Sequence, residues 1–159
     1  MESVTKIENS AFWGCVNLKT IRGYAGSYAE SYAKEYGYIF EDVEGKITTS
    51  YRTHVQSFGW QNPVTNGAMS GTSGEAKRLE AIQIKLYGEM ANHFDVYYRV
   101  HAQSYGWLGW AKNGEESGTA GLAKRLEGIQ IVLVPKGSAA PANNYKNIQS
   151  VNTKAYIKK

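Results

Sequence analysis

The sequence predicts a mainly β protein made of two tandem copies of one unit, with a small α/β segment before them. Residues 51–86 and 98–133 align without a gap at a spacing of 47 positions, and 22 of the 36 aligned residues are identical. Within each copy, apolar and polar residues alternate with the period of a strand, and glycine-rich turns interrupt the alternation. Ahead of the copies, tyrosines recur at helical spacing over residues 28–36.

The two copies, called the first and second repeat below, each begin and end with a predicted strand. In the opening strand of the first repeat, Tyr51, Thr53 and Val55 fall on one face. The opposite face carries Arg52, His54 and Gln56. In the closing strand, Ile82, Ile84 and Leu86 form an apolar face, and strict alternation places Glu80 on that same face.

A carboxylate on a buried face needs a partner. The second repeat has Glu127 where the first has Glu80. The candidate ion-pair partners are the arginines that both repeats share, namely Arg52, Arg78, Arg99 and Arg125. Arg78 and Glu80, with Arg125 and Glu127, could equally bind the hydroxyls of a sugar, because they offer paired donors and paired acceptors.

Tandem repeats bury one another's apolar faces. We therefore expect two superposable units related by an internal pseudo-twofold axis, in a sandwich or an open barrel, with an incomplete trefoil as the alternative. The expected boundaries are 46–92 and 93–137. Residues 138–159 would form a loop and a C-terminal strand, since 138–147 are rich in Ser, Ala, Pro and Asn and 151–157 suit a strand.

Residues 1–44 differ in character from the repeats. Ser27 and Glu30 form a capping box and Gly37 suits a C-terminal cap, so a helix is predicted over 28–36. Short strands are predicted at 4–7, 18–21 and 38–40.

The composition argues against several classes of protein. The net charge of +4 is mild and no dense run of lysine or arginine occurs, so nucleic-acid binding is not expected. No apolar run approaches the ~18 residues of a membrane span, and no signal peptide is visible at residue 1. Cys15 is the single cysteine, which allows no internal disulfide and no cysteine-rich metal site.

Repeated aromatic and polar residues are candidate ligand contacts. Trp60 and Trp107 could stack on sugar rings, or each could anchor the core of its own repeat. His54 and His101 could act as ligands or as structural hydrogen-bonding groups. The other candidate ligand contacts are Trp110, Tyr105, Gln56 and Gln103, and Phe58 is a further surface aromatic.

No sequence pattern of a common catalytic site is present. Glu80 and Glu127 occupy equivalent positions, so the distinct acid and base of a glycosidase are not expected. We expect no enzyme activity, no cofactor and no metal.

The repeats resemble the ChW repeat, a clostridial hydrophobic segment with a characteristic tryptophan. The residues that carry the resemblance in the first repeat are Tyr51-Arg52, His54, Gln56, Gly59-Trp60, Asn66-Gly67, Ser70-Gly71-Thr72 and Arg78-Leu79-Glu80, and the second repeat has the same residues 47 positions later. The resemblance implies a secreted or cell-surface protein of a Gram-positive bacterium that binds a glycan or a surface protein. A structural spacer is the third alternative.

The segment before the repeats resembles part of a second repeat family. Residues 4–21 resemble one unit of a BspA-like leucine-rich repeat array, and the segment from Gly23 to Tyr38 resembles its terminal cap. The oligomeric state stays open, because two repeats could complete a larger symmetric assembly through a second chain.

Overall fold

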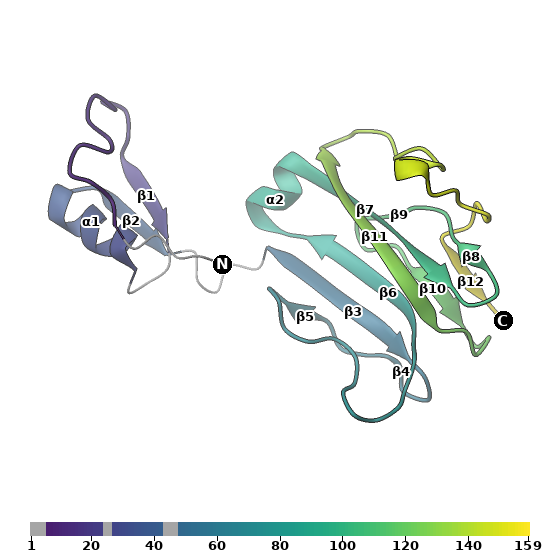
Figure 1. Cartoon of the computed structure of the whole chain (residues 1–159). Helices are drawn as coiled ribbons and strands as arrows, with labels where there is room; N and C mark the ends of the chain where they lie inside the picture. Colours follow the sequence, from purple (N-terminus) through teal and green to yellow (C-terminus); the bar gives the residue numbers. More distant parts are fainter. Residues whose placement is uncertain (1–5, 24–26, 43–47) are drawn as a thin grey trace. The chain divides into compact units, whose positions relative to one another are not determined.

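The computed structural model describes residues 6–23, 27–42 and 48–159 (Figure 1). The chain divides into two compact units, residues 1–46 and 47–159. Each unit is described by itself. Of the strand predicted at 4–7, residues 4 and 5 lie outside the described residues, and Lys6 and Ile7 are not in a strand.

The N-terminal unit is a parallel strand pair joined by a helix. Strand β1 (Thr20–Gly23) pairs with β2 (Ile39–Asp42), and α1 (Tyr28–Tyr36) connects them. The predicted helix is confirmed at both ends. The Ser27 hydroxyl accepts a hydrogen bond from the Glu30 amide at 3.4 Å, and Gly37 has φ 72°. Tyr32 and Ala33 of the helix pack on Ile21 in the core of this unit.

The second unit contains both repeats and is mainly β, as the sequence predicts. The first repeat forms β3 (Thr49–Val55), β4 (Gly59–Trp60), β5 (Val64–Thr65) and β6 (Leu79–Leu86). Helix α2 (Gly88–His93) leads into the second repeat. That repeat forms β7 (Phe94–Ala102), β8 (Gly106–Trp107), β9 (Ala111–Lys112), β10 (Ser117–Ala120) and β11 (Leu126–Pro135). A short 3-10 turn (Tyr145–Asn147) and β12 (Tyr156–Lys158) follow, so the last strand begins later than predicted.

The two repeats have the same local fold. Their long strands pair antiparallel, β3 with β6 and β7 with β11. His54 lies opposite Trp60 in the first repeat, and His101 lies opposite Trp107 in the second. The same non-glycine positions have positive φ in both, namely Ser57 and Ser104, Asn66 and Asn113, and Ala76 and Ala123. The expectation of superposable repeats is therefore confirmed at the level of local structure.

The strands form two sheets whose apolar faces contact each other, which is the arrangement of a sandwich (Figure 1). One sheet has the order β12-β10-β6-β3-β4, with β5 also on β3, and the other has the order β11-β7-β8, with β9 also on β7. Ile84 and Leu86 of β6 pack against Val96 and Tyr98 of β7 in the main core.

Strand β10 crosses from one repeat to the other. It belongs to the second repeat but pairs with β6 of the first, with Gly118 opposite Ala81. Gly118 has φ 128°, and a Cβ at this position would lie 2.4 Å from the Glu80 carbonyl oxygen. Only glycine allows this close approach of two strands. The equivalent residues of the first repeat, 70–73, form no strand.

No helix among the described residues is long and apolar enough to cross a bilayer.

Candidate ligand-binding site

Each repeat carries the same cluster of polar and aromatic side chains on the outer face of its sheet. The first strand supplies an arginine and a histidine, the short strand after it supplies a tryptophan, and the last strand supplies a glutamate and a glutamine. In the first repeat these are Arg52, His54, Trp60, Glu80 and Gln83. In the second repeat they are Arg99, His101, Trp107, Glu127 and Gln130.

A β-bulge brings the glutamate to this cluster. The pairing of β3 with β6 shifts where Ala81 lies opposite His54 and Leu79 lies opposite Val55, which leaves Glu80 as the extra residue. The expectation that Glu80 lies on the apolar face is therefore wrong, because a bulge reverses the alternation of faces beyond it. The same shift occurs between Leu126 and Gly128, at Glu127.

The glutamates pair with one arginine and one histidine in each repeat. The Glu80 carboxylate lies 2.8 Å from Arg78 Nε and 3.1 Å from His54 Nδ1. The histidine contact has the distance of an ion pair but not the angles of a hydrogen bond. Glu127 repeats both contacts, at 2.8 Å from Arg125 Nη2 and 3.2 Å from His101 Nδ1.

Arg52 and Arg99, the other two candidate partners for the glutamates, bond to glutamines instead. Arg52 Nε donates to the Gln83 side-chain oxygen, and Arg99 Nε donates to Gln130 at 2.7 Å. Arg52 lies directly opposite Gln83 in the strand register. These glutamines are not among the candidate residues predicted from the sequence. Their conservation between the two repeats, on the polar face of the last strand, was the available signal.

Each tryptophan lies between its histidine and its arginine. The rings of His54 and Trp60 are 5.5 Å apart and nearly perpendicular, and those of His101 and Trp107 are 5.6 Å apart. The Arg52 guanidinium lies 5.0 Å above the Trp60 ring, in the range of a cation–π contact. All four rings are half-buried.

In the second repeat the C-terminal segment, residues 143–150, covers the arginine of the cluster. Arg99 is fully buried, and its terminal nitrogens donate four hydrogen bonds to this segment. The acceptors are the Asn143 carbonyl at 2.8 Å, the Ser150 hydroxyl at 2.6 Å, the Tyr145 carbonyl at 3.3 Å and the Ile148 carbonyl at 2.7 Å. Residues 138–147, predicted as a flexible loop, thus contribute carbonyl groups that hold a buried cation.

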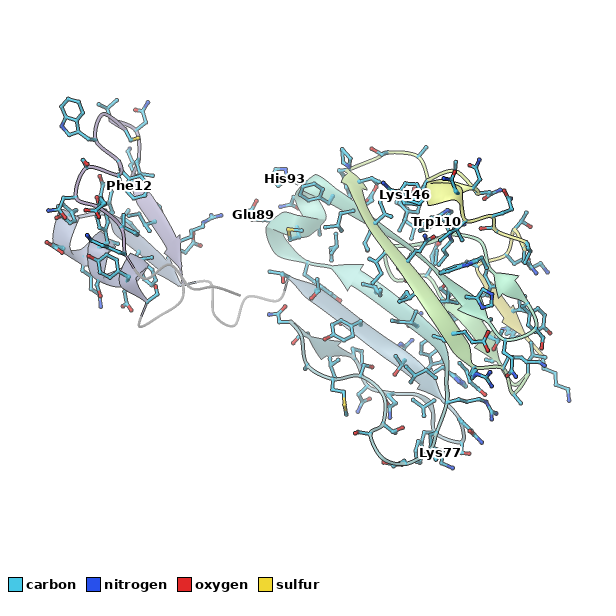
Figure 2. All side chains as sticks on the ribbon, viewed as in Figure 1. Phe12, Lys77, Glu89, His93, Trp110 and Lys146 are labelled. Atoms are coloured by element: carbon cyan, nitrogen blue, oxygen red, sulfur yellow. The ribbon has the colours of Figure 1, made fainter. Side chains whose placement is uncertain are left out.

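Trp110 takes part in this closure. Its ring lies 4.5 Å from the Arg99 guanidinium and 5.9 Å from the Tyr145 ring. Figure 2 shows Trp110 beside the turn that carries Lys146. Trp110 therefore packs under the C-terminal segment and is only half-exposed.

In the first repeat the Arg52 guanidinium stays uncovered, although the Trp60 ring of the same cluster lies 6.5 Å from the Tyr156 ring of β12. Arg52 is half-buried, and Gln83 is its single hydrogen-bond partner among the described residues. Pro63 stands where the second repeat has Trp110. Helix α2 follows β6 directly, so the first repeat has no counterpart of the segment that covers Arg99.

Residues 54–88 and 101–135 both match the family model described as ChW, Clostridial hydrophobic W. The chain is therefore similar to the ChW family in two segments, which together make up 70 of its 159 residues. The matched segments include the histidine, tryptophan, glutamate and glutamine of each cluster but begin after Arg52 and Arg99. No curated protein and no solved structure matches the chain significantly.

Within the described residues, the side chains of the remaining candidate residues make no hydrogen bond, ion pair or ring contact with the two clusters. Tyr105 packs with Leu108 and its neighbours in a small core cluster. Phe58 is 54% exposed, with the ammonium of Lys77 5.9 Å from its ring, and Lys77 is labelled in Figure 2. The backbone amides of Gln56 and Gln103 donate to the backbone carbonyls of Arg78 and Arg125. The side chains of the two glutamines make no hydrogen bond within the described residues.

A buried carboxylate, that of Asp95, stabilises the second repeat away from its cluster. Asp95 is 1% exposed. Hydrogen bonds from Lys112, Asn113 and the Gly137 amide, with a further contact from Lys136, hold the pKa of Asp95 well below its usual range. The first repeat has Thr48 at the position of Asp95 and therefore lacks the carboxylate that these groups contact. In the described part of the chain, no group of three or more His, Cys, Asp or Glu side chains could hold a metal ion.

Proposed function

We propose that this chain is a non-catalytic binding module of a secreted or cell-surface protein, and that it binds carbohydrate at the Arg52 cluster of the first ChW repeat. The observation that carries the proposal is the contrast between Arg52 and Arg99. The two arginines have equivalent glutamine partners and equivalent tryptophan contacts. Within the described residues, Arg99 has hydrogen bonds to its terminal nitrogens and Arg52 has none.

The acceptors around Arg99 indicate which chemistry suits Arg52. They are three carbonyl oxygens and one hydroxyl oxygen, all neutral. The Glu80 carboxylate lies in the Arg52 cluster and offsets part of its positive charge. A neutral chain rich in oxygen is therefore favoured over a phosphate or a carboxylate.

A glycan meets these requirements. Its ring and hydroxyl oxygens accept hydrogen bonds from a guanidinium, and its hydroxyls can donate to the unbonded side-chain oxygen of Gln56. Half-buried Trp60, which contacts Arg52, and exposed Phe58 supply apolar surface in the same repeat. A pure spacer is less well supported, because it would not need to leave His54 and Trp60 accessible.

One observation favours a protein ligand as the second candidate. Three of the four acceptors that Arg99 binds are backbone carbonyls of a segment that forms a turn and a short 3-10 helix. A peptide in a similar conformation could occupy the first repeat in the same way. The module would then join two surface proteins.

We also propose that the N-terminal unit is the end of a BspA-like leucine-rich repeat array. The parallel pair of β1 and β2, joined by α1, supports this assignment. The array would place the ChW repeats on a larger surface protein.

A glycan array probed with the full chain tests the carbohydrate proposal. We expect binding that is lost in Arg52→Ala and weakened in Gln83→Ala, with unchanged circular dichroism. Gln130→Ala is the matched control, because it removes the equivalent glutamine from the repeat that is already closed. Glycan binding that survives Arg52→Ala, or that is lost equally in Gln130→Ala, would contradict the assignment. A blank glycan array with Arg52-dependent binding on a peptide array would favour the protein ligand.

A further inference from the structure

The apolar face of β11 is open where the same face of β6 is closed. Ile84 and Leu86 of β6 are 8% and 5% exposed. Their equivalents in β11, Ile131 and Leu133, are 53% and 47% exposed. The residue types are identical, so the difference comes from what packs on each strand. Half-exposed aliphatic side chains in a row along one strand are unfavourable in water.

The second repeat supplies the elements that cover β6. Val96 and Tyr98 of β7 pack on Ile84 and Leu86, and the Tyr98 hydroxyl accepts a hydrogen bond from the Ile84 amide at 3.0 Å. Strand β10 pairs with the outer edge of β6. The last strand of a ChW repeat is thus completed by two parts of another repeat, its first strand and its Ser-Gly-Thr segment.

The first repeat contains the same two parts, but they leave β11 uncovered, and Tyr51 packs at the edge of the core that holds Ile84 and Leu86. Tyr51 of β3 is the equivalent of Tyr98 and is half-buried. The hydroxyls of both tyrosines donate to equivalent carbonyls, of Ala68 and Glu115, but within the described residues only that of Tyr98 also accepts from a strand amide. Residues 70–73, which correspond to β10, form no strand. Strand β11 lies at the end of its sheet, with one edge unpaired among the described residues.

An open groove separates these parts within the molecule. It has a volume of about 420 Å³ and lies between β3 and β11, with Tyr51, Ile84, Met90, Ile131 and Leu133 among its lining residues. Its walls are almost entirely apolar. In Figure 1, β6 is drawn between β3 and β11.

We propose that this open face docks a second molecule of the same chain. Strand β3 of the second molecule covers the apolar face of β11, and its residues 70–73 pair with the free edge of β11. Between two chains, this contact would repeat the packing of β7 and β10 on β6 that exists within one chain. Each molecule presents both halves, so the contact is reciprocal and closes as a twofold dimer. This proposal does not depend on the nature of the ligand at Arg52.

The oligomeric state of the full chain tests the proposal. We expect light scattering and sedimentation to show a dimer whose fraction grows from low to high micromolar concentration. Ile131→Lys should give a monomer, because it places a charge in the contact. In the monomer this residue is exposed, so melting temperature at low concentration should change little. Val132→Lys is the matched control, since Val132 is half-buried on the opposite face of the same strand; this variant should still dimerise.

Hydrogen exchange gives a second measurement that does not depend on the substitution. At high concentration the amides on the free edge of β11, that of Ile131 among them, should be protected, and dilution should remove the protection. A monomer at every concentration would overturn the proposal, and so would a dimer that Ile131→Lys leaves unchanged. A monomer that takes an apolar dye into the groove would also overturn it and would assign the groove to a small ligand.

Discussion

Arg52 and Arg99 occupy equivalent positions in two copies of one repeat, and yet Arg99 is fully buried whereas Arg52 is half-buried. Both lie over a tryptophan and bond to a glutamine. The difference is the C-terminal segment, which places four oxygen acceptors around Arg99. The same side chain therefore has a structural role in one repeat and is available to a ligand in the other.

The two arginines should differ in their contribution to stability. Arg99→Ala should lower the free energy of unfolding by about 3–5 kcal/mol, because it leaves buried acceptors without donors. Arg52→Ala should cost no more than ~1 kcal/mol, since it removes a half-buried cation–π contact and one hydrogen bond and leaves no set of buried acceptors without donors. Urea unfolding followed by tryptophan fluorescence measures both. Equal losses would mean that the C-terminal segment does not depend on Arg99.

The two glutamates should also differ. The Glu80 side chain is 5% exposed and that of Glu127 is 32% exposed. Glu80→Gln should cost about 2 kcal/mol, because it weakens a buried charged hydrogen bond to Arg78. Glu127→Gln should cost ~1 kcal/mol or less, as for a solvated ion pair. Thermal unfolding of the two variants, each compared with the parent chain, gives the answer; a larger loss for Glu127→Gln would contradict it.

Acid should destabilise the second unit, residues 47–159, through Asp95. The pKa of Asp95 is lowered in the folded state, first by the hydrogen bond from Lys112. Its contribution to stability is therefore complete above the ordinary aspartate pKa of ~3.9 and is lost as the pH falls below that value. Urea midpoints measured from neutral pH down to strongly acid pH should fall more steeply for the parent chain than for Asp95→Asn. Parallel curves would show that other carboxylates control acid unfolding.

Gly118→Ala should break the pairing of β10 with β6. Its Cβ would overlap the Glu80 carbonyl and Ala81, and φ is positive as well, so a loss of at least ~3 kcal/mol is expected. Gly74→Ala is the control, because Gly74 has φ 74° and no atom within 4 Å of the added Cβ. It should cost about 1–2 kcal/mol, from backbone strain alone. Calorimetric melting distinguishes the two, and similar losses would mean that the strand contact can relax.

Local structure followed from the sequence wherever it depends on near neighbours. The helix over 28–36 was predicted together with Ser27 and Gly37 at its ends, because capping involves residues only a few positions apart. Likewise, Tyr51, Thr53 and Val55 were placed on one face of a strand by alternation alone. The bulge at Glu80 was missed because it changes this alternation by a single residue, and no local pattern marks it.

By itself, the sequence determined the two-repeat organisation, the mainly β class and the residue types of the cluster, because identical segments with strand periodicity adopt the same local structure. Only the tertiary structure decided which of the two arginines is buried and which of the two apolar faces is exposed. Arg52 and Arg99, or Ile84 and Ile131, are alike in sequence, and their burial is set by distant segments that pack on one member of each pair. Burial is a property of the neighbours in space, and these neighbours lie far away in the chain.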